Sequence, residues 1–396
     1  MMFFFVTRYF PLAGFELWKL KRAEYVVTME RNSNSLVLFV GTQKGLFLVR
    51  HDSASNRWEI EGPHIAGYEI LHAWLDPRDG QTAYAAAYHL VWGTHIYRSD
   101  DRGSTWLALQ EVPCHPTDSY EQPVKAVWFI QPGHPAQREF LYGGIDPPGL
   151  FVSRDRGESW TPVVGINYHP TRDTWEPARG GFAIHSICVD PNRPERVYIA
   201  VSAGGVYRSD DAGATWVPAN RGVRAENLPE RFPETGHNVH RLIMHPAKPE
   251  RLYRQCYNGT YRSDDGAESW TEITPGLPSD FGYAIVTDPH DPDTVYQIPE
   301  ESSHVRATVG GRLRVYRSTT AGRDWEPLTR GLPQEHAYVS VLREAMDIDE
   351  RQPSGIYFGT AGGHLFASHD AGEHWELIAN FLPRILSVKA ALLSAA

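Results

Sequence analysis

Residues 97–106 read Tyr-Arg-Ser-Asp-Asp-Arg-Gly-Ser-Thr-Trp, and this stretch decides the fold of the chain. Gly103 supplies the positive φ that a tight hairpin between two strands requires. The side chains of Ser99 and Asp101 can bond to the backbone of the turn, where no neighbouring strand is available. Trp106 then opens the next strand with a large apolar surface. The stretch is therefore predicted to be a β-hairpin whose polar residues have a structural role.

This hairpin recurs along the chain. Its tryptophan falls at positions 58, 106, 160, 216, 270, 325 and 375, so the successive gaps are 48, 54, 56, 54, 55 and 50 residues. The first copy keeps the tryptophan and loses the aspartate and the glycine. Each repeat holds four short apolar runs, and a period near 50 residues is typical of propeller blades. The pattern predicts an all-β, seven-bladed β-propeller in which the hairpin joins the third strand (C) of each blade to the fourth (D).

Blade one lacks its first strand (A). Residues 36–42 read as a second strand (B) and residues 45–50 as a third, with no apolar run of the right kind ahead of them. Residues 382–389 resemble the strand A segments of the other blades and have no further strands after them. We therefore expect the C-terminal strand to complete blade one and close the ring, which removes open sheet edges. Two hairpins depart from the pattern, at Gly266-Ala267 and at Thr320, and are expected to be weaker.

The first residues of the chain precede the repeats. Residues 1–35 are predicted to be an extension outside the fold, with the true start near Met29, and residues 36–396 to be a single propeller.

The composition excludes several classes of function. The net charge is −10 with the signs interleaved, which argues against a nucleic-acid partner, and no apolar run is long enough to span a membrane. Three cysteines without short spacing favour a reducing compartment, so a cytoplasmic location is expected.

The hairpins resemble those of the BNR/Asp-box repeat proteins. The wider pattern is similar to bacterial WD40/YVTN/BNR-like repeat proteins, often labelled glycosyl hydrolase or exo-α-sialidase, over residues 36–390; it includes residues 39–47 (Phe-Val-Gly-Thr-Gln-Lys-Gly-Leu-Phe), His72, Trp92-Gly93 and residues 276–282 (Gly-Leu-Pro-Ser-Asp-Phe-Gly). Sialidases of this type have six blades and an Arg-Ile-Pro motif, and this chain has seven repeats and no such motif. The resemblance therefore implies a glycosyl-hydrolase-like activity rather than a true exo-α-sialidase.

A binding site is expected on the face of the propeller opposite the hairpins. The D-to-A and B-to-C loops lie on that face, and the longest of them span residues 162–182, 217–238 and 298–311. A glycosidase needs two carboxyl groups that flank the scissile bond, and the candidates are Asp146, Glu176, Glu300 and Glu301. Trp175 is predicted to stack on a sugar, and Arg179 to bind a carboxylate or phosphate.

Histidines form a second group of candidates. His72, His185 and His240 each begin or enter a strand A, and strand A lines the central channel, while His89 and His95 lie in the B-to-C loop of blade two. The three strand-A histidines could converge as a ligand-binding or metal-binding ring. Alternatively, each caps a strand, bonds to a neighbouring carbonyl or faces water. No His-Glu-x-x-His spacing occurs, and neither a metal nor another cofactor is predicted.

Two functions remain open at this point. The first is a propeller that binds a small polar or carbohydrate-like ligand on its loops, with glycoside-hydrolase-like activity. The second is a non-catalytic scaffold that binds a protein partner. A catalytic site predicts a polar pocket with carboxylates and a shifted pKa, whereas a scaffold predicts a flatter face with exposed apolar surface.

Overall fold

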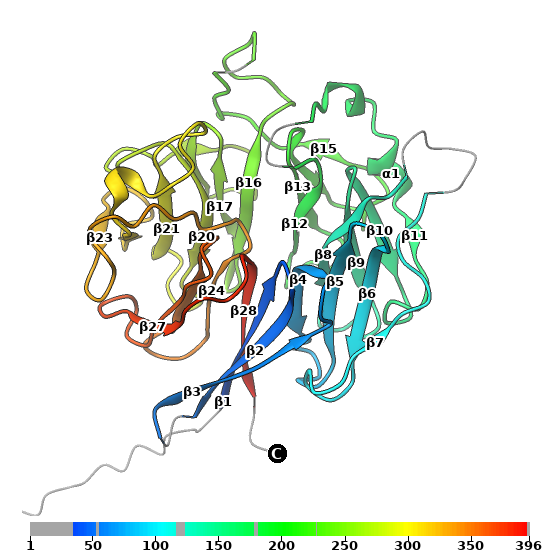
Figure 1. The fold of residues 1–396 in the computed structure, drawn as a ribbon. Coiled ribbons are helices and arrows are strands. Elements are labelled where there is room, and N and C mark those ends of the chain that lie inside the picture. Colours follow the sequence, from blue (N-terminus) through cyan, green and yellow to red (C-terminus); the bar gives the residue numbers. More distant parts are fainter. Residues whose placement is uncertain (1–34, 53–54, 116–122, 178–180, 227, 394–396) are drawn as a thin grey trace, which may run out of the picture. The chain divides into compact units, whose positions relative to one another are not determined.

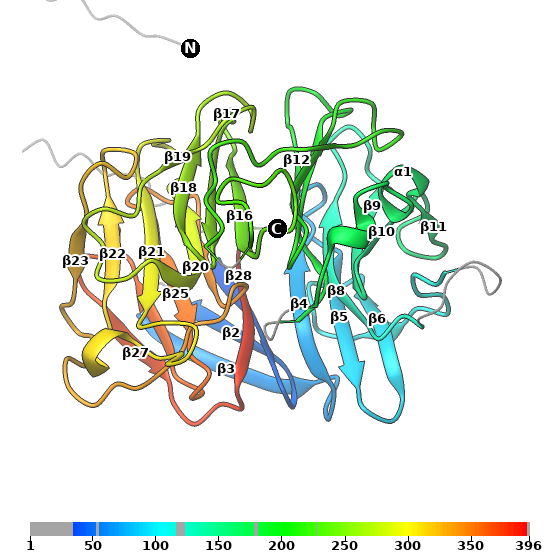
Figure 2. The same ribbon diagram turned by 90° about the horizontal axis from the view of Figure 1, so that it is seen from above.

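The computed structural model describes residues 35–52, 55–115, 123–177, 181–226 and 228–393. These residues form seven antiparallel four-stranded sheets. Figures 1 and 2 show the sheets around a common centre, with the first strand of each sheet on the inside and the fourth at the periphery. The predicted seven-bladed propeller is confirmed. The predicted extension, apart from Ser35, lies outside the described residues.

Each blade runs outward from the centre in the strand order A, B, C, D. Blade one consists of β28 (Ile385–Leu393), β1 (Ser35–Thr42), β2 (Gly45–Asp52) and β3 (Arg57–His64). Blades two to four follow in chain order: β4 (Glu69–Leu75), β5 (Ala83–His89), β6 (Gly93–Ser99) and β7 (Leu107–Ala108); β8 (Ala126–Pro132), β9 (Leu141–Asp146), β10 (Gly149–Ser153) and β11 (Thr161–Pro162); β12 (Ile184–Val189), β13 (Val197–Val201), β14 (Gly205–Ser209) and β15 (Val217–Pro218).

Blades five to seven continue the same order: β16 (Val239–His245), β17 (Lys248–Cys256), β18 (Gly259–Ser263) and β19 (Thr271–Glu272); β20 (Phe281–Thr287), β21 (Val295–Glu300), β22 (Val315–Ser318) and β23 (Glu326–Leu328); β24 (Met346–Ile348), β25 (Ile356–Gly359), β26 (Leu365–Ser368) and β27 (Glu376–Ala379). Three short helices lie in loops between strands: α1 (Val164–Asn167), η1 (Arg172–Thr174) and η2 (Val309–Gly311). None of the helices in the described ranges is long and apolar enough to cross a membrane.

The C-terminal strand closes the ring as predicted. β28 pairs antiparallel with β1, in a register that joins Ser35 to Leu393 at one end and Thr42 to Ile385 at the other. Gly41 lies where β1 meets both β28 and blade two, and a Cβ there would collide with Ser387 and with the carbonyl of Ile70. β1 is thus paired on both sides, with β28 and with β2, so the junction of the two chain ends leaves no open edge on β1.

The recurring hairpin contains the predicted hydrogen bonds. Residues 99–105, 153–159, 209–215, 263–269, 318–324 and 368–374 are called the box turns below. In the first, Ser99 Oγ accepts from the N–H of Gly103 (2.8 Å), and Asp101 accepts from both the N–H (2.8 Å) and the hydroxyl (2.7 Å) of Thr105. Arg102 and Gly103 have φ of 59° and 90°. The fifth-blade turn makes the same bonds although its Gly266 and Ala267 exchange places.

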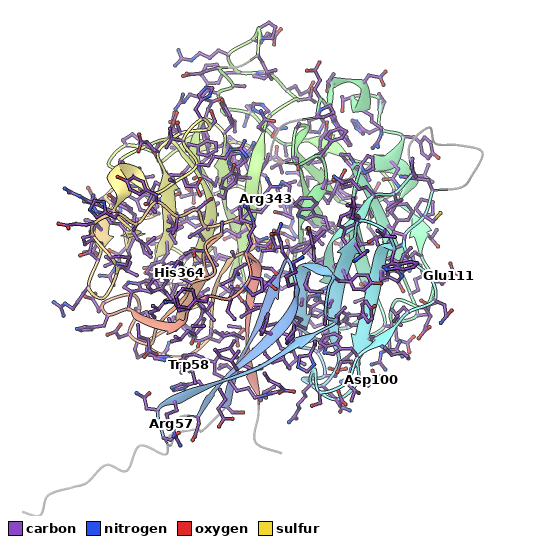
Figure 3. All side chains as sticks on the ribbon, viewed as in Figure 1. Arg57, Trp58, Asp100, Glu111, Arg343 and His364 are labelled. Carbon is purple, nitrogen blue, oxygen red and sulfur yellow. The ribbon has the colours of Figure 1, made fainter. Side chains whose placement is uncertain are left out.

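The box turns and the A-to-B turns share one face of the propeller. The N–H of Arg102 donates to the carbonyl of Gln81 just ahead of strand B (2.9 Å), and the N–H of Ala212 donates likewise to Glu195 (2.8 Å). This face is called the box face, and the opposite one, made by the B-to-C and D-to-A loops, is called the loop face. In Figure 3, Asp100 lies on the box face, whereas Arg343 lies near the centre of the ring.

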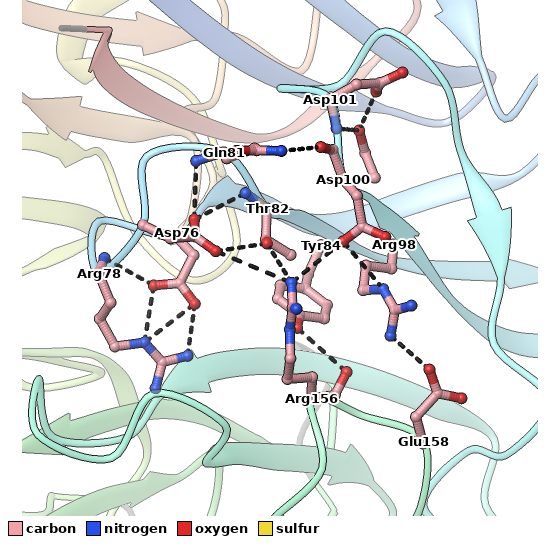
Figure 4. Close-up of polar contacts among 12 residues, drawn as sticks. Asp76, Arg78, Gln81, Thr82, Tyr84, Arg98, Asp100, Asp101, Arg156 and Glu158 are labelled. Carbon is pink, nitrogen blue, oxygen red and sulfur yellow. Dashed lines mark hydrogen bonds and ion pairs between the residues drawn. The ribbon is translucent and has the colours of Figure 1, made fainter.

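The box turns also join neighbouring blades, which the sequence did not predict (Figure 4). Arg98 of blade two donates to Glu158 of blade three (2.6 Å), and Arg156 of blade three reaches back to Asp100 (3.2 Å). The hydroxyl of Tyr84 donates to the carbonyl of Arg156 (3.2 Å). The same link recurs between blades four and five and between blades six and seven, from Tyr198 to Gly266 (3.2 Å) and from Tyr296 to Ala371 (3.3 Å). Each of these tyrosines is the second residue of strand B in its blade.

The box tryptophans pack between blades, as predicted. Trp270 donates from Nε1 to the carbonyl of Ala219 in the preceding blade (2.9 Å), and Trp325 donates to Ile273 in the same way (2.9 Å). Trp216 is buried in an apolar cluster shared with blade three. The core is therefore distributed between adjacent sheets, which keeps the strand ends on the loop face rigid.

Candidate functional site

A cavity of about 360 Å³ opens at the loop-face end of the central channel. Its wall is built by the ends of A and B strands and the adjoining loops of blades one, two, three, six and seven. The lining residues are Gln43, Glu69, Leu71, Tyr88, Lys125, Ala126, Trp128, Asp146, Tyr283, Arg306, Leu342, Arg343, Glu344, Arg384 and Leu386. The wall is therefore rich in charged groups, and it includes one of the acids that the sequence singled out.

Asp146 is the predicted acid that lines this cavity. It ends β9, its side chain is buried, and its Oδ2 accepts from Nζ of Lys125 at 3.3 Å. Burial raises the pKa of Asp146, because the ionised form loses its hydration, and the ammonium of Lys125 offsets part of that rise. A raised pKa favours the protonated form, which is the form that a general acid needs.

Glu300 lies behind the cavity wall at the end of β21. Its Oε1 accepts from the hydroxyl of Ser340 and from the N–H of Val341 (3.2 Å), while its Oε2 has no hydrogen-bond partner among the described residues. Burial raises the pKa of Glu300 to about 7, against the two hydrogen bonds and the nearby charges of Arg306 and Arg384. Glu300 is therefore a second predicted acid with a raised pKa at the loop-face end of the channel.

A buried ion pair crosses the channel below the cavity. Arg241 on β16 of blade five pairs with Glu344, which precedes β24 of blade seven. Glu344 lines the loop-face cavity, whereas Arg241 lines a second cavity of about 340 Å³ on the box-face side. The pair thus lies between the two cavities. Arg343, next to Glu344, lies over the rings of Trp128 (5.6 Å) and Tyr283 (5.9 Å).

The three strand-A histidines bond to the protein and line neither cavity. His185 donates from Nε2 to the carbonyl of Val239 in the next blade (3.0 Å), and His240 donates from Nδ1 to Gly282 (2.6 Å). His72 stacks on Phe129 at 4.1 Å. Burial lowers the pKa of all three, to about 3 for His240. Within the described ranges no group of three or more His, Cys, Asp or Glu side chains could hold a metal ion.

The remaining candidates lie outside the cavity wall. Trp175 is only 5% exposed and donates from Nε1 to the hydroxyl of Tyr207 (2.7 Å), so the stacking platform expected there is wrong: the ring has no open face. Glu176 and Glu301 are exposed and do not line the cavity. Arg179 lies outside the described residues.

His89 and His95 belong to an aromatic cluster on blade two. Their rings lie 5.2 Å and 5.4 Å from that of Tyr68, and the ring of Trp92 lies 6.4 Å from that of His89. Nδ1 of His89 accepts from the N–H of Trp92 (3.2 Å), which shapes the tip of the β5–β6 hairpin. This cluster stands beside the cavity, because Glu69 and Tyr88, the neighbours in sequence of Tyr68 and His89, line it.

Exposed apolar side chains distinguish the two faces. In the described part of the chain, the exposed large apolar residues outside D strands all lie on loop-face segments, and none lies in an A-to-B turn or a box turn. They are Leu90, Val91, Trp92, Val164, Tyr168, Phe232, Val305, Tyr338 and Phe381. The loop face is therefore the face that offers contact surface to a ligand.

The sequence did not single out several residues of the cavity. Glu69, Tyr283, Arg343, Glu344 and Arg384 come from four different blades, and none belongs to a recognisable motif. Three of them occupy or directly precede a strand A, so their position in the repeat was the only signal that could have located them near the channel.

Comparison with known proteins identifies carbohydrate-active relatives. No family model matches the chain. A probable oligoxyloglucan-reducing end-specific xyloglucanase of Neosartorya fischeri is 28% identical over 206 residues, which are 50% of this chain and 23% of that protein. A xyloglucanase of Acetivibrio thermocellus is 25% identical over 275 residues, or 60% of this chain and 30% of that protein. The matches thus span less than a third of these relatives.

Solved structures agree on the fold. The GH74 xyloglucanase of Xanthomonas campestris superposes with a TM-score of 0.61 at 18% identity, over 88% of this chain and 53% of that one. The curated relatives are xyloglucanases rather than sialidases, in line with the prediction that a true exo-α-sialidase is not expected.

Proposed function

We propose that this chain is a carbohydrate-active propeller that hydrolyses a glycosidic bond in the loop-face cavity. The observation that carries the proposal is Asp146, a buried carboxyl with a raised pKa that lines a cavity on the face expected to bind ligands. The xyloglucanase relatives support the same reaction class and favour an enzyme over a scaffold. Cleavage of a glycosidic bond requires a carboxylic acid with a raised pKa that protonates the leaving-group oxygen.

Asp146 and Glu69 are the proposed catalytic pair. Asp146 donates its proton to the glycosidic oxygen, and Lys125, at 3.3 Å, orients the carboxyl group. Glu69 lines the same cavity and is partly exposed, so water and substrate can reach it. It attacks the sugar or activates a water from the other side. Glu344 also lines the cavity, but its carboxylate is engaged by Arg241.

The experiment tests hydrolysis of a panel of oligosaccharides and polysaccharides, xyloglucan included, and measures the reducing ends that are released. Asp146→Asn keeps the shape of the side chain and removes the acid, so kcat should fall roughly 10²- to 10⁴-fold, the usual contribution of a general acid. Glu176→Gln is the matched control, because Glu176 is an exposed loop-face acid outside the cavity, and it should keep full activity.

Two results would contradict the proposal. One is full activity of Asp146→Asn in a protein whose thermal unfolding matches the parent. The other is absence of hydrolysis across the whole panel by the folded parent protein.

A further inference from the structure

Three arginines from three blades line the loop-face cavity. Arg306 belongs to the B-to-C loop of blade six, Arg343 precedes β24 of blade seven, and Arg384 directly precedes β28 of blade one. We infer that the cavity receives a sugar that carries a negative charge, as a carboxylate or a phosphate ester, which these three guanidinium groups bind. The sugar part of this inference rests on the proposed function, whereas the charge part rests on the arginines alone.

Tyr283 lines the same cavity as the three arginines. Burial raises the pKa of Tyr283, and the charges of Arg306, Glu300, Arg343 and Arg384 also act on its hydroxyl. The guanidinium of Arg343 is buried over the rings of Tyr283 (5.9 Å) and Trp128 (5.6 Å), and such contacts hold a planar cation in place. The three positive groups therefore belong to the wall of one cavity.

Two of these arginines, Arg306 and Arg384, are not ion-paired with the acids that the structure describes in the cavity wall. Arg306 and Arg384 are exposed, and neither forms an ion pair with any acid in the described ranges. Asp146 is paired with Lys125, and Glu344 is paired with Arg241 beneath the cavity.

Two further acids stand near the arginines. Glu300 is bonded to Ser340 and Val341, and with a pKa raised to about 7 it is only partly ionised at neutral pH. Glu69 lines the wall and is the remaining acid. The cavity therefore holds an excess of positive charge in a chain whose net charge is −10.

An anionic ligand offsets the repulsion between these positive groups. Like charges gathered in a cavity repel one another more strongly than in open water, because the protein screens them less. A carboxylate or a phosphate accepts paired hydrogen bonds from a guanidinium fork, which a neutral hydroxyl does not match in strength. The positive patch thus selects for an acidic group on the sugar.

The test is calorimetric binding of four probes to the full chain: glucuronate, glucose 6-phosphate, glucose and inorganic phosphate. At least one of the two anionic sugars should bind more tightly than glucose and than free phosphate. Arg384→Gln and Arg306→Gln should each weaken that binding about tenfold or more, the usual effect of losing one charge-assisted hydrogen bond. Arg57→Gln removes the same charge at the outer edge of blade one, on β3, and should change nothing (Figure 3).

Each outcome bears on the inference. Equal binding of glucose and both anionic sugars, or unchanged anionic-sugar binding in Arg384→Gln and Arg306→Gln, would overturn it, and so would inorganic phosphate that binds as tightly as either sugar. Whichever anionic sugar binds more tightly identifies the acidic group. Tight glucuronate binding without hydrolysis of any glycan supports the inference and counts against the proposed function. If the chain hydrolyses neutral glycans and the Arg384→Gln variant does so equally well, the proposed function is supported and the inference of a charged sugar is contradicted.

Discussion

Glu300 shows how one side chain can be stabilised in its neutral form. It is 1% exposed, and the cost of burying its charge exceeds the help from two hydrogen bonds and two nearby arginines. The sequence marked Glu300 and Asp146 as acids on the loop face, and both have a raised pKa. It could not indicate which carboxyl groups share the cavity wall, because that depends on how separate blades meet.

The raised pKa of Glu300 predicts a pH-dependent stability. Below the ordinary value of 4.5 the carboxyl is protonated in both the folded and unfolded states. As the pH rises towards 7 the unfolded chain ionises first, so folding loses about 3 kcal/mol between pH 4 and pH 8. Glu300→Gln keeps the acceptor for Ser340 and removes this loss, so urea unfolding should show the variant gaining on the parent at pH 8 relative to pH 4.

The neighbouring residue provides the control. Glu301→Gln changes an exposed acid and should leave the pH dependence of stability as it is in the parent. Identical pH profiles for Glu300→Gln and the parent would show that Glu300 ionises normally in the folded state.

At the scale of elements, the box turns were the most predictable part of the molecule. Ser99, Asp101 and Gly103 have local roles that a sequence can reveal, because each bonds within a few residues. The strand-A histidines were not predictable in this way. Register shifts lie at Ile70/His72, at Ile184/Ser186 and at Val239/Arg241, and such bulges re-aim side chains.

The sixth-blade box turn predicts a coupled pair of substitutions. Thr320 replaces the usual aspartate and accepts from the N–H of Asp324 (3.0 Å), where four of the other five box turns have a serine or threonine such as Thr105. Thr320→Asp alone would place two carboxylates together and should not stabilise the protein. Combined with Asp324→Thr it should restore the two bonds seen at Asp101 and add about 1 kcal/mol, similar to a helix cap.

Urea unfolding followed by intrinsic tryptophan fluorescence measures the stability of both proteins. A gain from Thr320→Asp alone equal to that of the double variant would mean that residue 324 has no part in the turn.

At the scale of the whole molecule, the even spacing of the tryptophans predicted the number of blades, and the orphan strand at the end of the chain predicted the closure. The links between blades were beyond prediction. The bond from Tyr84 to Arg156 joins residues 72 positions apart, and the ion pair of Arg241 and Glu344 joins two blades that are not neighbours. Contacts of this kind follow from the ring and leave no local pattern.

Removal of residues 382–396 tests the closure. The deletion exposes the edge of β1 and removes Ile385 and Val388, both fully buried, so the loss is expected to be about 5 kcal/mol or more, a large part of the stability of a typical domain. Thermal unfolding should show a clear fall in Tm, and a synthetic peptide of residues 382–396 should restore part of it. A melting curve equal to that of the parent would refute closure by this strand.

The ion pair of Arg241 and Glu344 lies between the loop-face cavity and the cavity on the box-face side. Asp146 and Glu69 line the first of the two, so a glycan that reaches them arrives over the B-to-C and D-to-A loops. The cleaved product departs over the same loops, so the segments that admit the substrate also govern its release.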